Sequence, residues 1–102
     1  MPDSRLLLLS PGDNVFVLRD ALEAGDVVAL EEGEASVPVR LGLGHKIARV
    51  AIAQGEKIVK YGAPIGRATE DIAAGAHVHV HNVVSDYTPT YALAQTSEDV
   101  AR

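Results

Sequence analysis

Asp71-Ile72-Ala73-Ala74-Gly75-Ala76-His77-Val78 is one of three stretches in this chain that follow the same short pattern. The other two are Ala21-Leu22-Glu23-Ala24-Gly25-Asp26-Val27-Val28 and Ala51-Ile52-Ala53-Gln54-Gly55-Glu56-Lys57-Ile58-Val59. In each stretch, an apolar residue, two linking residues and a glycine are followed by two variable residues and a β-branched residue. Glycine after a small or polar pair is typical of a turn position with positive φ, and β-branched residues favour a strand. We therefore predict three turn-then-strand units, at Gly25, Gly55 and Gly75.

The rest of the chain fits an all-β fold. Asn14–Leu18 and Ala35–Leu41 are β-rich stretches between turn residues, and Pro38 would place the second of them at a sheet edge. No apolar pattern of helical period is long, although His45–Ala53 could form one or two short helical turns. Nine glycines and five prolines among short strands predict hairpins joined by long crossing loops.

Length and composition indicate one globular domain. The chain has 102 residues, of which 47% are hydrophobic and 23% charged, a balance typical of a folded protein. We expect a domain over residues 1–90 and a tail or linker over residues 91–102. The absence of cysteine excludes disulfides and thiolate sites. The apolar run Leu6–Leu9 is too short to cross a bilayer and lacks the features of a cleavable signal, so a cytoplasmic location and no membrane partner are expected.

Charge is unevenly distributed along the chain. The formal net charge is −5, which argues against nucleic-acid binding. Between Arg40 and Arg67, however, six basic residues stand against one acidic residue, whereas the remainder carries three basic and thirteen acidic residues. This middle segment could gather positive potential for a small anion, or it could be an ordinary solvated surface.

Histidines alternate with other residues in His77-Val78-His79-Val80-His81-Asn82. Successive side chains of a strand point to opposite faces, so we expect the three imidazoles on one face, roughly 6.5–7 Å apart. Val78 and Val80 would then point into the core. Imidazoles bind divalent cations and exchange protons near neutrality, because their ordinary pKa is about 6.5. The stretch therefore predicts a metal-binding or proton-transfer site.

Two further clusters carry residue types that suit an anionic ligand. In Gly42-Leu43-Gly44-His45-Lys46, glycines let the backbone approach a ligand, and the His-Lys pair offers an acid/base group beside a cation. In Val59-Lys60-Tyr61-Gly62-Ala63-Pro64, a Lys-Tyr pair runs into a turn. Each cluster alone is also what an ordinary hairpin or loop would contain.

In chain order these motifs are Gly44-His45-Lys46, Ile52-x-x-Gly55, Lys60-Tyr61-Gly62-x-Pro64-Ile65-Gly66-x-Ala68-Thr69, Asp71-Ile72-x-x-Gly75 and Val78-His79-x-His81-Asn82. The series resembles the N-terminal module of the altronate and galactarate dehydratases, called the SAF domain, and is similar to the small subunit of sulfolactate sulfo-lyase. The resemblance covers about residues 5 to 84. An ordered series of motifs is far more specific than any one of them.

The resemblance implies a β-clip fold, a lyase that removes water from a sugar acid by metal-assisted elimination, and a divalent metal, Fe²⁺ or Mn²⁺. Lys46 and Lys60 would neutralise the substrate carboxylate, His45 would transfer a proton, and Tyr61 is a candidate acid for the leaving group. The resemblance assigns no role to His77. The full set of candidates comprises catalytic His45, Lys46, Lys60 and Tyr61, substrate-binding Gly44, Gly62 and Asn82, and the metal ligands His79 and His81.

The family's dehydratases usually carry a long C-terminal catalytic region, which residues 1–102 do not contain. We therefore expect a large catalytic subunit as partner, a small hydroxy acid as substrate and no activity from the chain alone; a homo-oligomer is an open possibility. Three alternatives stay open: a small subunit of a sulfolactate sulfo-lyase, a non-catalytic module for sugar-acid binding or assembly, and a small metal-storage or metal-sensing protein.

Overall fold

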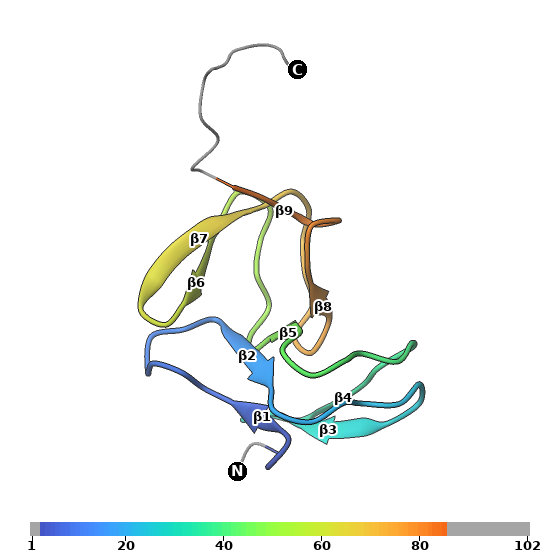
Figure 1. Ribbon diagram of the computed structural model, residues 1–102. Coiled ribbons are helices and arrows are strands. Elements are labelled where there is room, and N and C mark those ends of the chain that lie inside the picture. The colour runs from blue at the N-terminus through green and yellow to red at the C-terminus, as the bar shows by residue number, and fades with distance from the viewer. Residues whose placement is uncertain (1–2, 86–102) are drawn as a thin grey trace.

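Nine short strands make up the part of the chain that the structure describes. The structure, a computed structural model, describes residues 3–85 (Figure 1). The strands are β1 (Leu6–Leu7), β2 (Val15–Leu18), β3 (Val27–Ala29), β4 (Glu34–Ser36), β5 (Lys46–Ala48), β6 (Lys57–Lys60), β7 (Ala63–Ala68), β8 (His77–Val78) and β9 (Val83–Val84). Residues 3–85 contain no helix. The predicted all-β class is confirmed, and the short strands in open sheets are consistent with a small β-clip fold.

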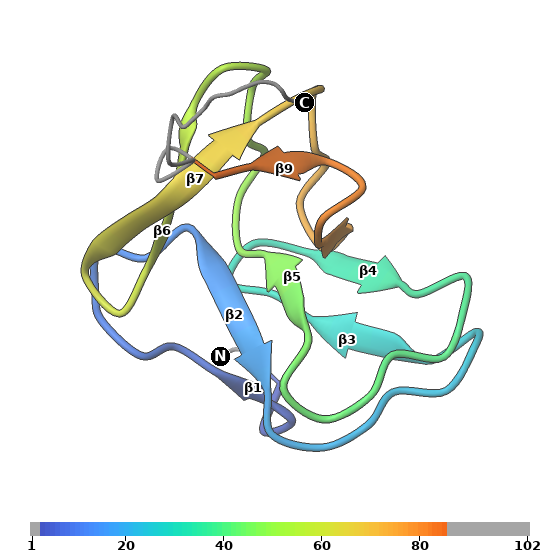
Figure 2. The same ribbon diagram turned by 45° about the horizontal axis from the view of Figure 1, so that its top comes forward.

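The strands form three antiparallel sheets. β1, β2, β5 and β8 lie side by side in one sheet, β3 and β4 form a hairpin, and β6, β7 and β9 form the third sheet. The β3–β4 and β6–β7 hairpins project in different directions from the β2–β5 pair, which lies between them (Figure 2). The β5–β8 pair joins residues far apart in sequence, and it is this pair that positions the candidate site described below.

The turn pattern occurs four times. The copies are Leu22-x-x-Gly25-x-x-Val28, Leu41-x-x-Gly44-x-x-Ile47, Ile52-x-x-Gly55-x-x-Ile58 and Ile72-x-x-Gly75-x-x-Val78. Each glycine has a φ between 85° and 89°, as the third position of a type II turn requires. The three predicted turns are confirmed, and Gly44 adds a fourth that we did not predict, because we interpreted it as a ligand-approach glycine.

Each turn glycine also bonds to a neighbouring segment in the same way. Gly25 N–H donates to the Val37 carbonyl at 2.7 Å, and Val37 N–H donates to the Asp26 carbonyl at 3.0 Å. The same pair of bonds joins Gly44 to Leu18, Gly55 to Ala68 and Gly75 to Ala48. The bonds of Gly55 and Gly75 repeat those of Gly25 and Gly44 after 30 or 31 residues. The domain therefore contains two similar halves, a first half over residues 18–47 and a second half over residues 48–78, with β1, the start of β2 and β9 outside them.

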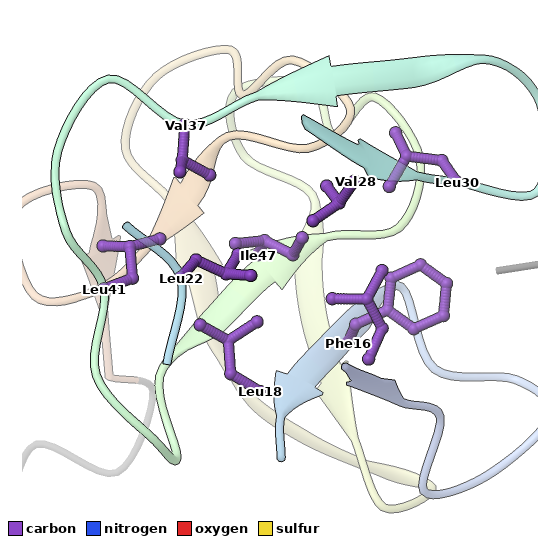
Figure 3. Packing of buried hydrophobic residues seen from close by; sticks show 9 residues of the cluster. Phe16, Leu18, Leu22, Val28, Leu30, Val37, Leu41 and Ile47 are labelled. Carbon is purple, nitrogen blue, oxygen red and sulfur yellow. The ribbon is translucent and has the colours of Figure 1, made fainter. Parts of the chain in front are cut away.

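The apolar positions of the pattern build two hydrophobic clusters, one for each half. The first half contributes Leu22, Val28, Leu41 and Ile47 to a cluster that also contains Phe16 (Figure 3). The second half contributes Ile52, Ile58, Ile72 and Val78 to the other cluster. All eight are at most 4% exposed. Burial of each such side chain stabilises the fold by about 1.5–3 kcal/mol, so the repeated pattern accounts for much of the core.

Three local expectations are wrong. Helical turns do not form over His45–Ala53, because β5 is bonded to a strand on either side and Ile52 bridges to Ile72. The strand predicted over Ala35–Leu41 is shorter, and Pro38 lies outside it, exposed. Val80 does not point into the core, since it is 81% exposed. The predicted tail over residues 91–102, and the end of the predicted domain, lie outside the described residues.

Candidate functional site: a histidine cluster where the two halves meet

The β5–β8 ladder explains why histidines distant in sequence come together. Ile47 pairs with His77 and Lys46 pairs with Val78. Continuing this register by one pair places His45 opposite His79, just beyond the end of the ladder. Because side chains alternate along a strand, His45, His77 and His79 belong to the same face, with Lys46 on the other. The cluster therefore arises at the seam between the two halves.

The distances agree with this register. Nδ1 of His45 lies 3.0 Å from Nε2 of His77. The ring centroid of His45 is 5.1 Å from that of His77 and 5.2 Å from that of His79, while the His77 and His79 rings stack at 5.3 Å with 10° between their planes. The ring of His81 lies 5.4 Å from that of His77. All four histidines of the chain thus gather at one place.

The chain does not continue as a strand beyond Val78, because the Asn82 side chain bonds the backbone. Its Oδ1 accepts from the His79 N–H at 2.9 Å and its Nδ2 donates to the His77 carbonyl at 2.8 Å. Such local side-chain bonds compete with a strand ladder. The predicted strand over residues 77–82 is therefore wrong in its second part, where a turn replaces it. Asn82 is 3% exposed, and a contact between it and a substrate stays a prediction.

The site favours the neutral form of its central imidazole. Burial, and then the nearby histidines His45, His79 and His81, lower the pKa of His77 to about 4. A neutral imidazole has a free nitrogen that can accept a proton or bind a metal ion. Burial also lowers the pKa of Lys46, and the charge of Lys60 adds to the effect. Lys46 of β5 and Lys60 of β6 thus lie near each other, and the charge of Lys46 also acts on His77.

Two open pockets border the cluster. A pocket of about 280 Å³ is lined by Lys46 and His79, with Ile65, Val80, Val83 and Ser85. A second pocket of about 410 Å³ includes His77, His81 and Asn82 in its lining, with apolar residues of the Val37–Leu41 segment. The histidines are therefore reachable from solvent on two sides, as a binding site requires.

Tyr61 and Gly62 lie at the tip of the β6–β7 hairpin, which is held by a residue that we did not single out from the sequence. The carboxylate of Asp13, 1% exposed, accepts from Tyr61 N–H at 2.7 Å and from Gly62 N–H at 2.8 Å. It also accepts from Ser10 N–H at 3.1 Å. Tyr61 has a φ of 56°, rare for a residue with a side chain, and its ring is exposed. No sequence signal joins Asp13 to a turn 48 residues away.

The predicted site residues are thus partly brought together. The imidazoles of His45, His79 and His81 meet around His77, and Lys46 shares a pocket with His79. Gly44 forms the turn that leads into His45. Within residues 3–85, no hydrogen bond or ring contact joins the side chain of Tyr61 to the histidines. The chemical roles predicted for these residues stay predictions.

Part of the basic middle segment has a structural role. Arg49 binds Glu31 through two nitrogens at 2.8 Å, and it donates to the carbonyls of Pro11 and Asp13. Arg40 pairs with Glu23 at 3.2 Å. The positive charge near the histidines includes that of Lys46, which acts on His77 and shares a pocket with His79, and Lys60 in turn acts on Lys46.

Comparison with known proteins agrees with the resemblance seen in the motifs. Residues 4–86 match the family described as the altronate/galactarate dehydratase SAF domain. The altronate dehydratase of Escherichia coli (strain K12) is 44% identical over 70 residues, which are 69% of this chain and 14% of that enzyme. The altronate dehydratase of Bacillus subtilis (strain 168) is 38% identical over 87 residues, which are 78% of this chain and 18% of that enzyme.

A relative of similar size also matches. The (2R)-sulfolactate sulfo-lyase subunit alpha of Chromohalobacter salexigens is 36% identical over 85 residues, which cover 67% of this chain and 90% of that subunit. The chain thus spans less than a fifth of the two altronate dehydratases and nearly all of a sulfo-lyase subunit. Among residues 3–85 there is no helix long and apolar enough to cross a membrane.

Proposed function

Since this chain belongs to the altronate/galactarate dehydratase SAF domain family, we propose that it is the small module of a lyase that removes water from a sugar acid. The observation that carries this proposal is the cluster of four histidines beside Lys46, which has Lys60 near it, on open pockets. Such a site offers proton carriers next to positive charge, and a hydroxy acid brings a carboxylate to it.

The chemistry of dehydration explains why both residue types are needed. A base removes the proton beside the carboxylate, an enediolate forms, and an acid protonates the departing hydroxyl. Fixed positive charge at the enediolate usually supplies the largest share of the rate. In our proposal Lys46 and Lys60 hold the carboxylate, and His45 transfers a proton through its ring nitrogen. Tyr61 is a candidate for the acid that protonates the leaving group.

The donor set of the cluster fits a transition metal. Imidazole nitrogen suits iron, zinc, nickel and copper, whereas manganese prefers carboxylate and water. Of the two ions expected from the family, an imidazole donor set therefore favours Fe²⁺ over Mn²⁺. A bound ion would act as a Lewis acid that stabilises the enediolate oxygens. The contribution of the chain is to hold such an ion beside the cationic pair.

The small size of the module supports the proposal that it acts together with a catalytic partner. Its relatives are either a small part of a longer dehydratase or a subunit of a sulfo-lyase. The pockets beside the histidines are open, whereas binding sites for small molecules usually enclose most of the ligand. We propose that a large catalytic subunit or region covers the cluster and completes the site, so that the chain alone is inactive.

A second candidate reaction changes only the leaving group. The match to 90% of a sulfo-lyase alpha subunit favours a small subunit that eliminates sulfite from sulfolactate. Sulfolactate is also a hydroxy acid, and its elimination needs the same stabilisation of an enediolate.

Co-purification with a large subunit tests the proposal. The chain would be expressed with the large lyase subunit of its source, loaded anaerobically with Fe²⁺ and assayed with altronate, galactarate and sulfolactate. Formation of a keto acid without sulfite indicates the dehydratase, and release of sulfite indicates the sulfo-lyase. We expect Lys46→Ala and His79→Ala to lower kcat/KM by about 100-fold or more.

Arg40→Ala is the matched control, because Arg40 belongs to the same basic segment but is 62% exposed and pairs with Glu23. It should stay within about twofold of the parent enzyme, as is usual for surface substitutions. Sedimentation of each complex separates catalysis from assembly. Near-normal kcat/KM for both Lys46→Ala and His79→Ala would contradict the proposal, and loss of the complex without loss of the chemical step would indicate an assembly module instead.

A further inference from the structure

We propose that His45, His77 and His79 form a binding site for one divalent transition-metal ion, built within this chain and needing no ligand from a second polypeptide. This ligand set differs from the pair expected from the sequence, His79 and His81. The inference rests on the positions of the imidazoles and is independent of the reaction that the assembled enzyme catalyses.

The three imidazoles already lie within reach of one ion. One ring nitrogen from each of them can be chosen so that all three lie within 4.8 Å of one another. Nitrogens bound to one ion at about 2.0–2.1 Å lie about 3 Å apart at right angles and about 3.4 Å apart in a tetrahedron. His45 Nδ1 and His77 Nε2 already lie 3.0 Å apart, and only His79 has to rotate inward. Since His79 is exposed, its ring is free to do so.

The backbone behind the three ligands is fixed by hydrogen bonds. His45 N–H closes a turn onto the Gly42 carbonyl, and the His45 carbonyl accepts from Leu18 N–H at 2.8 Å. His77 lies in the β5–β8 ladder. The Asn82 side chain bonds both the His77 carbonyl and the His79 N–H, which sets the spacing between these two histidines. The backbone therefore loses little conformational entropy when an ion binds, which favours affinity.

His81 is a less suitable ligand for the same ion. Its ring approaches that of His77 at 5.4 Å but lies on the side of the second pocket, whereas His79 lines the first. Within residues 3–85, the set of metal-binding side chains that converges contains His45, His77 and His79 and no carboxylate. Three neutral nitrogens leave further coordination positions open, and these face solvent through the pocket that Lys46 also lines.

The nearby ammonium groups set the kind of complex that forms. Lys46 lies beside His45 in sequence and shares a pocket with His79, so it repels a bare cation. The same positive charge attracts an anion to the open positions of the ion. We therefore expect moderate affinity for the metal alone, in a site shaped for a metal ion with an oxyanion as its remaining ligand.

Cobalt binding to the purified chain of 102 residues tests the inference without partner or substrate. Co²⁺ would be titrated into the metal-free protein, with its visible absorption reporting nitrogen ligands and calorimetry giving the stoichiometry and Kd. We expect one ion per chain and saturation below about 1 mM Co²⁺. His79→Ala should weaken binding at least about tenfold, and His45→Ala and His77→Ala should do the same.

His81→Ala is the comparison variant, because it removes an exposed imidazole that contacts His77 but does not belong to the proposed ligand set, and it should weaken binding clearly less than His79→Ala does. His79→Ala keeps the test valid if the half-buried histidines prove necessary for folding, which urea unfolding of each variant would reveal. The inference fails if the parent chain binds no Co²⁺ at about 1 mM, or if His81→Ala weakens binding as much as His79→Ala does. Either outcome leaves the proposed lyase role intact, because neither partner nor substrate enters the measurement.

Discussion

The two halves of the domain share a backbone plan but differ at the tips of their hairpins. In the first half the β3–β4 tip carries Glu31 and Glu32, and Glu31 is engaged by Arg49. In the second half the β6–β7 tip carries Lys60 and Tyr61, and the buried Asp13 carboxylate accepts two backbone hydrogen bonds from the tip. One tip is thus an acidic surface tied to an arginine, and the other presents a lysine and a tyrosine on a fixed support.

Different positions of the repeated pattern build the fold and carry the chemistry. The apolar and glycine positions are kept in all four turns, since they form the core and the left-handed turns. The two positions after each glycine vary, and they read Asp26-Val27, His45-Lys46, Glu56-Lys57 and Ala76-His77. His45, Lys46 and His77 therefore occupy places that the fold leaves free.

Two turn glycines share a conformation but differ in available space, and substitution of the crowded one should lower stability the most. A Cβ on Gly75 would lie 2.2 Å from Cβ of Ala35, whereas a Cβ on Gly25 meets nothing within 4 Å. Both residues have positive φ. Gly25→Ala should cost about 1–2 kcal/mol of unfolding free energy from strain alone, and Gly75→Ala about 3 kcal/mol or more. Urea unfolding measures both changes. Equal losses of unfolding free energy would mean that the segment around Ala35 shifts to make room for the added methyl group at no cost.

The second effect concerns the support behind the β6–β7 tip. Asp13→Asn replaces one acceptor oxygen by an NH₂ group, so an N–H of Tyr61, Gly62 or Ser10 loses its partner. A buried donor left unpaired costs about 1–3 kcal/mol. Urea unfolding should show this loss, and hydrogen exchange should accelerate at Tyr61 and Gly62 more than at Leu30 and Gly33 of the other tip. Uniform acceleration at both tips would contradict a local support.

A smaller effect arises where the halves meet, at His77. Its pKa is lowered to about 4 in the folded protein, against about 6.5 when unfolded, so the unfolded chain binds more protons between these pH values. The stabilisation from His77 is fully present above pH 6.5 and is lost as the pH falls toward 4. With a chelator present, the Tm of the parent chain should fall by a few degrees more than that of His77→Gln over this window. Parallel curves would mean that His77 keeps an ordinary pKa.

The smallest effect is expected at the first tip. Glu31→Gln weakens a partly exposed ion pair with Arg49, whose guanidinium still donates to the Pro11 and Asp13 carbonyls. Surface ion pairs contribute little and are screened by salt. The urea midpoint should therefore stay close to that of the parent chain, with any loss confined to low salt. A loss as large as that of Asp13→Asn would show that the two tips are equally dependent on their carboxylates.

Much of the fold was predictable from the sequence because the turns are local. Gly25, Gly55 and Gly75 could be identified from spacing alone, and Gly44 has the same spacing and could have been found with them. The end of β8 could not, because alternation favours a strand through His81 until the side-chain bonds of Asn82 are known. Strand periodicity describes the backbone and carries no information on such competing bonds.

The candidate site was predictable in its residue types but not in its assembly. The sequence predicts a histidine-rich edge near a His-Lys pair, and both are found there. Two contacts of the site join residues that are distant in sequence. His45 bonds His77, which lies 32 positions later, and Asp13 supports Tyr61, which lies 48 positions later. Such contacts depend on which strands pair and in which register, and the sequence of a single strand does not specify its pairing.

The register between β5 and β8 also has a consequence for redesign. Lys46 faces Val78 and Ile47 faces His77, so the two strands are related by an approximate twofold axis that passes between them. Lys46 and His77 occupy corresponding places, each two residues after a turn glycine. Exchanging the two side chains would move the imidazole to the other face of the β5–β8 pair, away from His45 and His79, while the backbone stays the same.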